Sequence, residues 1–212
     1  AFAPLVARIT FAGGVCAVGN ILRTRGFNIN GPEVKTSGVD VTFNVELGEV
    51  LGGELSGGAE ATYNFEYKTG NAVTAGLVTV PAFDAVGKYN FGVDPRSFPQ
   101  WRGSAFLDYR RGPHSLRGMF RYIDGMRDMR GLLAIAGFPS LGTTTPDGAH
   151  IDAFSTYDLY YQFKRDDGLS LSVPVVNLTD ADPPFAQVAI TYDAFPPNPL
   201  GRVIKVGVTK TF

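Results

Sequence analysis

The stretch at residues 38–47, GVDVTFNVEL, places an apolar side chain at every second position. Valine, phenylalanine and leucine fill the odd positions from 39 to 47, whereas aspartate, threonine, asparagine and glutamate fill the even positions. Successive side chains of a β-strand point to opposite faces, so this period of two predicts a strand with one apolar and one polar face.

The same alternation continues along most of the chain. It recurs clearly in the segments at residues 59–68, 101–110, 114–124, 151–164, 168–178 and 201–212. Phe106 is an exception, because it falls among the polar residues of its segment. Two weaker strands are expected near residues 4–12 and 20–28. The sequence therefore predicts an all-β protein of about nine strands.

The lengths and the connections of these segments distinguish two architectures. Several segments exceed the roughly 5 to 6 residues of soluble strands and approach the roughly 9 to 11 that cross a bilayer. Short turns at RRGPHS and RDDG, and a modest one around GEVLGGELSGG, alternate with long loops near residues 70–99, 129–149 and 179–200. Aromatic residues cluster near the strand ends, at Tyr63, Tyr67, Trp101, Tyr109, Tyr122, Tyr157 and Tyr161.

Short turns on one rim, long loops on the other and aromatic girdles favour an antiparallel transmembrane β-barrel. A soluble β-sandwich, whose apolar face packs on a second sheet, is the alternative. A count of nine strands is odd, however, and an all-antiparallel sheet with an odd count cannot close on itself. Either one strand is missing from the count, within residues 85–92 or 186–192, or the chain is part of a larger barrel.

The composition excludes some classes of partner and chemistry. The net charge is −1 with no cluster of Lys and Arg, so no nucleic acid is expected as a partner. Cys16 is the only cysteine, and it is either a buried apolar side chain or paired with sequence outside this chain. His114 and His150 are the only histidines, and they are expected on opposite rims. The sequence therefore predicts no enzyme, no catalytic or metal-binding residues and no cofactor.

Two stretches carry a resemblance to a family. The C-terminal block from residue 175 resembles the end of TonB-dependent receptors of the outer membrane, and the strand at residues 37–47 looks like another strand of that family. The residues that carry the resemblance are Ser37, Gly38, Val39, Asp40, Asn177, Leu178, Asp180, Pro183, Pro184, Tyr192, Asp193, Gly201 and Arg202. Together with the segments at 99–109 and 154–163, which also read like strands of that family, the resemblance covers most of residues 20–212.

The last strand looks like a signal for barrel assembly. In this family, a terminal aromatic residue preceded by alternating apolar residues resembles the signal that the barrel-assembly machinery reads. Ile204, Val206, Val208 and Phe212 match that pattern, whereas Lys210 departs from it. The barrel-assembly machinery is therefore an expected partner.

The resemblance implies a larger protein than this chain. Family receptors are plugged barrels of roughly 22 strands, so residues 1–212 would form the C-terminal part of the barrel domain. The plug would precede residue 1. The resemblance also implies a bacterial outer-membrane location, contact with membrane lipid, and uptake of a scarce bulky ligand, energised by the TonB system through the plug. That ligand would be an iron chelate, a vitamin or an oligosaccharide. The alternative functions are a small passive outer-membrane barrel or porin and a soluble β-sandwich binding module.

Candidate ligand contacts lie on the polar faces and at the base of one long loop. These residues are Arg102, Arg117, Arg121, Arg127, Asp128 and Arg130. Each could instead form a salt bridge inside the barrel, with Glu66, Asp108, Asp152 or Asp158 as partner, or contact the plug.

Overall fold

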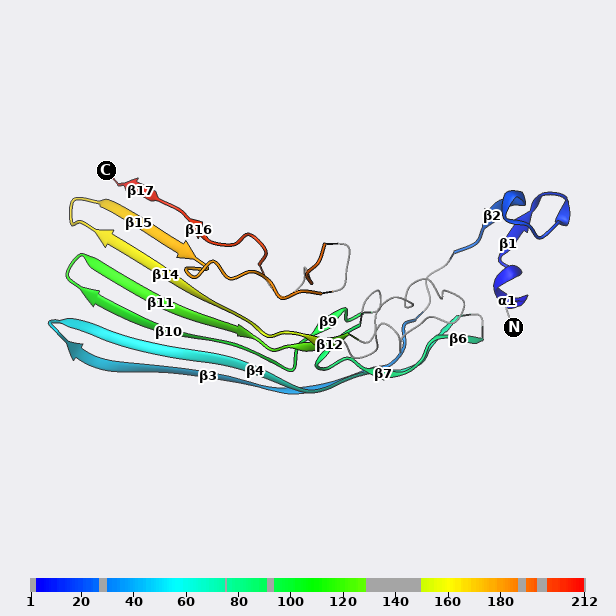
Figure 1. Ribbon diagram of the computed structural model, residues 1–212, viewed down its shortest axis with the longest axis horizontal. Coiled ribbons are helices and arrows are strands. Elements are labelled where there is room, and N and C mark those ends of the chain that lie inside the picture. Colours follow the sequence, from blue (N-terminus) through cyan, green and yellow to red (C-terminus); the bar gives the residue numbers. More distant parts are fainter. Residues whose placement is uncertain are drawn as a thin grey trace.

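The computed structural model describes residues 3–26, 30–74, 76–90, 94–128, 150–186, 190–193 and 198–211. Its main element is a nine-stranded antiparallel sheet with the order β16-β15-β14-β11-β10-β4-β3, in which β17 also pairs with β15 and β7 with β4 (Figure 1). The strands are β3 (Val34–Val50), β4 (Gly53–Thr69), β7 (Phe83–Asp84), β10 (Trp101–Arg111), β11 (His114–Ile123), β14 (Phe154–Lys164), β15 (Leu169–Val176), β16 (Val203–Ile204) and β17 (Gly207–Lys210). The prediction of an all-β fold with a large antiparallel sheet is confirmed.

The register keeps the two kinds of side chain on opposite faces across the whole sheet. One row across five strands consists of Phe43, Ala59, Ala105, Phe120 and Tyr157. The next row along the strands consists of Thr42, Glu60, Ser104, Arg121 and Thr156. We call these the apolar face and the polar face. The period of two in each segment is thus continued from strand to strand by the pairing.

The strands in the sheet differ from those that the sequence predicted. The two weak N-terminal strands do not join it: β1 (Ile9–Phe11) and β2 (Ile21–Thr24) pair only with each other. They lie with the short helices α1 (Ala3–Val6), η1 (Ala12–Gly14) and η2 (Val18–Asn20), apart from the sheet (Figure 1). At the other edge, β16 and β17 are two parts of one interrupted strand, because both pair with β15 and Lys205 donates its backbone N–H to Pro174 between them.

The described residues of the two regions suggested for a missing strand add none to the main sheet. Residues 85–92 contain β8 (Lys88–Tyr89), which belongs to a separate four-stranded sheet, and Phe185 and Tyr192 form only an isolated bridge. β17 shares the position of β16 beside β15, and β7 pairs only with the end of β4. The nine strands of the main sheet therefore occupy seven successive positions from β3 to β16 among the described residues. Each neighbour runs antiparallel to the next, so the strands at the two edges run in the same direction.

The connections at the two ends of the sheet differ in length. Short turns join β3 to β4, β10 to β11 and β14 to β15, and all lie at one end, as does the end of β17 (Figure 1). The first of these is tighter than predicted, because Leu51 and Gly52, with φ of 52° and 73°, turn the chain between two 17-residue strands. Positive φ at both central residues is the geometry that matches the twist of a hairpin. We call this the short-turn end and the other the long-loop end.

The long-loop end carries the small sheets and the buried core. One sheet has the order β13-β12-β8-β9, and another pairs β5 with β6. Their strands are β5 (Ala72–Thr74), β6 (Leu77–Val80), β8, β9 (Ser97–Phe98), β12 (Met126–Asp128) and β13 (His150–Ile151). Tyr89, Ile151 and Ala186 form a buried cluster there. No helix in the described part of the chain has the length and hydropathy needed to cross a membrane.

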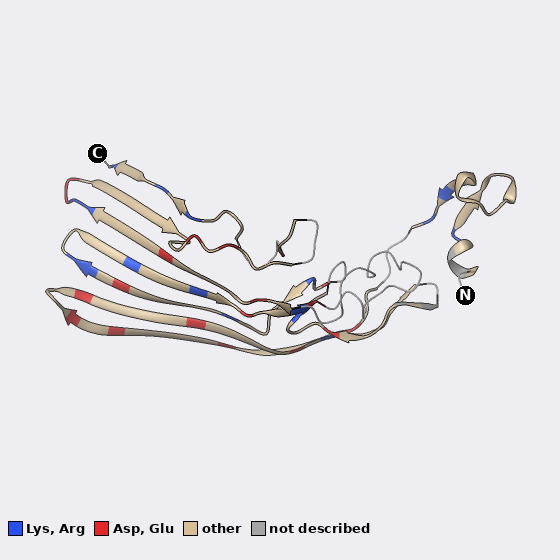
Figure 2. Cartoon of the chain, in the orientation of Figure 1, with Lys and Arg blue, Asp and Glu red and all other residues tan. Residues whose placement is uncertain are grey.

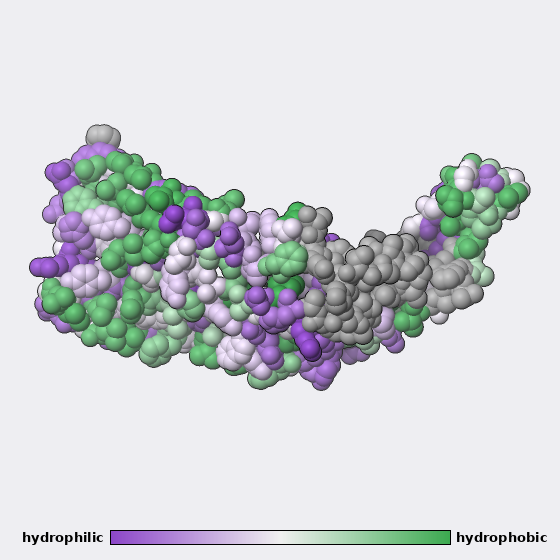
Figure 3. Space-filling view, viewed as in Figure 1, coloured by the Kyte–Doolittle hydropathy of each residue, from purple (hydrophilic) through white to green (hydrophobic). Residues whose placement is uncertain are grey.

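Nothing in the described residues covers the apolar face of the main sheet. Val41, Phe43 and Leu107 are 56%, 58% and 56% exposed although they lie in the middle of long strands. The space-filling view shows hydrophobic residues in patches over the sheet, with hydrophilic residues along the edge of the short-turn end (Figure 3). A second sheet packed on this face, as a β-sandwich requires, is not among the described residues.

Candidate ligand-binding groove on the polar face

The polar face is hollowed into a groove of about 770 Å³. Side chains from β3 at one side and from the residues after β15 at the other line the same space, so the sheet curves around its polar face. Polar and charged side chains provide much of the lining: Asp40, Thr42, Glu60, Thr62, Arg102, Ser104, Arg121, Thr156, Asp158, Tyr160, Asn177 and Asn198.

Charge is divided between neighbouring hairpins. β3 and β4 carry six carboxylates and two lysines, whereas β10 and β11 carry five arginines and one aspartate. Figure 2 shows this as red bands on the first hairpin and mostly blue bands on the second. Within the groove, Asp40 and Glu60 accept hydrogen bonds from the hydroxyls of Thr62 and Ser104, at 2.6 and 3.0 Å. Opposite charges thus face the groove from adjacent walls.

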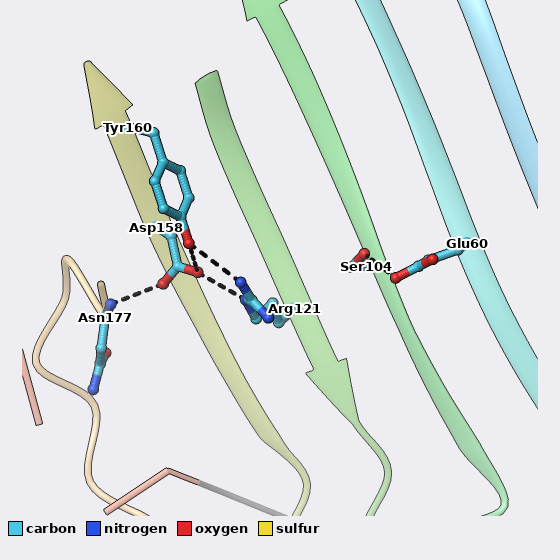
Figure 4. Close-up of polar contacts among 6 residues, drawn as sticks. All are labelled: Glu60, Ser104, Arg121, Asp158, Tyr160 and Asn177. Atoms are coloured by element: carbon cyan, nitrogen blue, oxygen red, sulfur yellow. Dashed lines mark hydrogen bonds and ion pairs between the residues drawn. The ribbon is translucent and has the colours of Figure 1, made fainter. Parts of the chain in front are cut away.

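A buried carboxylate organises the wall of the groove around β14. The Asp158 side chain is fully buried, and its Oδ2 lies 2.7 Å from Nε of Arg121 (Figure 4). The Tyr160 hydroxyl donates to the same oxygen over 3.2 Å and accepts from Nη2 of Arg121 over 3.3 Å. Oδ1 accepts the backbone N–H of Asn177 over 2.8 Å. This network, Arg121–Asp158–Tyr160–Asn177, ties β11 and β14 to the connection that follows β15.

Phe106, the exception in the sequence pattern, has a structural role on the polar face. The ring of Phe106 lies over Gly58, where an added Cβ would be 2.7 Å from the ring. The Arg117 guanidinium lies 4.6 Å from the centroid of the same ring. Arg117 also makes a bidentate pair with Asp108, with distances of 2.7 and 2.6 Å. An aromatic ring thus replaces the side chain that glycine lacks and supports the ion pair.

Replacing Gly58 by alanine should destabilise the protein by roughly 2 kcal/mol, because overpacking of this size forces neighbours to shift. The added Cβ would lie 2.5 Å from Oδ1 of Asn44 and 2.7 Å from the carbonyl oxygen of Phe43, and the backbone oxygen cannot rotate away. Gly118→Ala is the matched control, since nothing lies within 4 Å of its Cβ position. Denaturant unfolding of both variants checks the prediction, and equal stabilities would contradict it.

The five predicted ligand contacts within the described residues fall into three groups. Arg102 lines the groove and makes no ion pair or hydrogen bond through its side chain within the described residues. Arg117 and Arg121 are paired with Asp108 and Asp158. Arg127 and Asp128 lie in β12, in the small sheet at the long-loop end, and Asp128 is only 1% exposed. Arg130 lies outside the described residues.

The other two carboxylates considered as barrel salt-bridge partners contact different bases. Asp152 lies 3.5 Å from the His150 ring. Glu66 lies beyond the aromatic pair Tyr63–Trp101 and contacts Lys35 at 3.2 Å and Lys68. Hydrogen bonds from Lys68 and then from Lys35 hold the pKa of the Glu66 carboxyl below its ordinary value. Neither carboxylate belongs to the groove.

Several residues of the C-terminal motif form the link between β15 and β16. Asn177 has a positive φ of 54°. Its side-chain amide donates to the carbonyl of Ala181 and accepts the backbone N–H of Ala181, both over 2.9 Å, which closes the turn. The Asp180 carboxylate accepts the backbone N–H of Arg202 over 2.7 Å, and Arg202 Nη1 donates to the carbonyl of Leu178. Gly201 supplies the positive φ, 63°, that this approach requires.

The remaining motif residues lie at three places. Gly38 follows Ser37 at a bulge in β3, where a Cβ would be 2.8 Å from the carbonyl oxygen of Tyr63. Val39 is on the apolar face and Asp40 lines the groove. Pro183, Pro184, Tyr192 and Asp193 lie at the long-loop end, where Asp193 accepts a hydrogen bond from Ser97.

The predicted assembly signal lies on the apolar face. Ile204, Val206 and Val208 are 62%, 69% and 68% exposed, and Lys210 shares their face because it pairs with Leu169. Phe212 lies outside the described residues. Ile204, Val206 and Val208 thus alternate along the last strand, and their reading by the assembly machinery stays a prediction.

No group of His, Cys, Asp and Glu side chains in the described ranges could hold a metal ion. Comparisons with protein-family models, with curated proteins and with solved structures found no match. The structure thus defines the class of protein as all-β, with a curved antiparallel sheet that has an exposed apolar face and a charged polar groove.

Proposed function

We propose that this chain forms part of the wall of a transmembrane β-barrel in a bacterial outer membrane. The apolar face would contact lipid, and the polar groove would line the lumen. The whole protein would be a TonB-dependent receptor that takes up a scarce bulky ligand, such as an iron chelate, a vitamin or an oligosaccharide. The observation that carries the proposal is the exposed apolar face that continues across the main sheet.

Exposure on this scale is costly in water. Soluble monomers rarely leave a contiguous apolar patch beyond a few hundred Å² uncovered. Here Val41 and Phe43 in β3, Leu107 in β10, Tyr157 in β14 and Val208 in β17 are all between 49% and 68% exposed on one face. A lipid environment makes such a face favourable, and the sheet satisfies its backbone groups internally except at its edges.

Aromatic residues bound the apolar face at both ends. Tyr63, Trp101 and Tyr122 lie towards the long-loop end, and Tyr109 and Tyr161 lie towards the short-turn end. Trp101 and Tyr109 are separated by about 27 Å along β10, at about 3.4 Å per residue. That is the scale of the apolar band of outer-membrane barrels, roughly 25 Å tall between aromatic girdles.

The two edges support a barrel larger than the described sheet. β3 and β16 run in the same direction, so they cannot pair with each other in an all-antiparallel barrel. An odd number of additional strands would be needed between them, and these would also cover the exposed edges. A small closed barrel or porin made of these strands alone is less compatible with this arrangement.

The receptor part of the proposal rests on the resemblance and on the groove. The motif residues Asn177 and Asp180 lie in the turn after β15, and the Asp180 carboxylate accepts the backbone N–H of Arg202, next to Gly201, which is compatible with a structural role for that motif. A mixed-charge groove of about 770 Å³ is large enough to contact a ligand of drug size or a plug.

The intact mass of the native gene product from a detergent-extracted outer-membrane fraction tests this proposal. We expect a mass several times the 22.8 kDa of this chain, with a plug-sized region upstream of residue 1. A native product of 22.8 kDa would contradict the receptor and would leave a small barrel or a β-sandwich.

A further inference from the structure

The apolar face changes character at the short-turn end. The row that crosses the strands through Tyr109 contains Leu116, Tyr161 and Val173. The next row towards the turns contains Arg111, His114 and Phe163 on the same face. From the row of Leu107, Leu159 and Val175 outwards, the face thus passes from aliphatic residues to a row with two tyrosines and then to a row with Arg111 and His114. This is the order of environments that a membrane-spanning surface meets as it leaves the hydrocarbon for the headgroups.

Arg111 is available to a ligand at this position. It lies opposite His114 in the β10–β11 hairpin, and its residue is exposed. Its guanidinium lies beside the β3–β4 turn, where a Cβ on Gly52 would be 3.9 Å from Nε. Within the described ranges, the Arg111 side chain makes no ion pair or hydrogen bond.

His114 is held in place by aromatic neighbours. Its Nδ1 lies 2.7 Å from the Tyr161 hydroxyl, and its ring centroid is 5.0 Å from that of Phe163. These contacts orient the imidazole at the rim and leave Nε2 without a hydrogen bond among the described residues. The other hydroxyl of the aromatic row, that of Tyr109, donates to the carbonyl of Leu51 over 3.4 Å.

Positive charge on the apolar face occurs only at this end of the described strands. Arg111 and Lys210 are its only Lys or Arg residues, and Lys210 is engaged with Asp167. At the long-loop end, Tyr122 instead donates to an aspartate, Asp124, over 3.1 Å. A ligand that fits the short-turn end would therefore combine an anionic group with an apolar part that lies along the apolar face.

We propose that Arg111 and His114 bind the phosphate of a phospholipid headgroup in the leaflet at the short-turn end, beside the aromatic rings of Tyr109, Tyr161 and Phe163. This inference rests on the proposed position of the apolar face in lipid. The guanidinium presents a planar fork of donors that matches phosphate oxygens, and the imidazole can donate from the opposite strand. The acyl chains would lie along the apolar face next to Leu116 and Val173.

Native mass spectrometry of the full-length protein in a phosphate-free detergent tests the site. The probes are a short-chain phosphatidylglycerol, the matching diacylglycerol without phosphate, and inorganic phosphate. We expect the phospholipid to bind most tightly, with a Kd that rises at least fivefold in Arg111→Gln and less in Arg111→Lys. Arg110→Gln is the matched control, because Arg110 is the adjacent residue on the polar face, and its Kd should equal that of the wild type.

Each other result has a distinct meaning. Equal Kd values for Arg111→Gln and Arg110→Gln, or equal binding of the phospholipid and the diacylglycerol, would overturn the phosphate site and leave the lipid-facing wall intact. Inorganic phosphate that binds as tightly as the phospholipid would overturn the assignment to a lipid. If neither lipid bound to any variant, the proposed lipid contact of the apolar face would itself fail.

Discussion

Replacing Asp158 by alanine is expected to lower the free energy of unfolding by about 3 kcal/mol, the lower end of the range for breaking a buried ion pair. The Asp158 side chain is fully buried and serves three donors: Arg121, Tyr160 and the backbone N–H of Asn177. Alanine would leave that N–H and the guanidinium without their acceptor. Arg121 is 51% exposed and can be rehydrated, so we expect the lower end of the range.

The measurement is denaturant unfolding of the full-length protein refolded into lipid vesicles. Asp152→Asn is the control, because the Asp152 side chain is 85% exposed and its nearest base is the ring of His150. Its effect should stay below about 0.5 kcal/mol, as for most surface substitutions. A loss below 1 kcal/mol in Asp158→Ala would show that the network contributes little, and the link from β14 to the connection after β15 would need another explanation.

Replacing Ala105 by arginine should destabilise the protein in a bilayer by roughly 2 to 4 kcal/mol, the cost of a cation at the midplane of a lipid-facing strand. Ala105 lies midway along β10 between Trp101 and Tyr109, and it shares the apolar face with Ala59 and Phe120. The residue is exposed, so the longer side chain has space and the cost would come from the surroundings.

Ser104→Arg is the matched control for this prediction. Ser104 is the adjacent residue on the polar face, and an arginine there would lie near Glu60, the present partner of the serine hydroxyl. We expect a change within about 0.5 kcal/mol, because a solvated cation beside a carboxylate costs little. Equal effects of the two substitutions in vesicles would contradict a lipid-facing apolar side and would favour a face that meets water.

The local pattern predicted the strands well where their two faces have different surroundings. The segments around Val41, Leu107 and Val173 are strands with the predicted faces, because alternation depends only on the geometry of the extended backbone. The two N-terminal segments contain short strands, as predicted, but these strands pair with each other and do not join the main sheet. Their alternation is weak, and a local pattern does not contain the identity of the partner strand.

Phe106 breaks the alternation of its segment, but the sequence does not show why an aromatic residue stands there. Its departure from the alternation was visible, but its partners, Gly58 and Arg117, come from two other strands. Register alone brings them together. The groove also depends on the register. Arg102 and Arg121 were predicted from their places on polar strand faces. The contacts of Tyr160 and Asn177 with Asp158 were not predicted.

The sequence by itself determined the all-β class, the two faces of each strand and the position of the short turns, because each of these follows from neighbouring residues. Only the tertiary structure shows which segments join the main sheet and what surrounds Asp158. Two of the partners of Asp158, Asn177 and Arg121, are separated from it by 19 and 37 residues along the chain. Such contacts depend on which strands pair and in which register, and only the folded sheet specifies both.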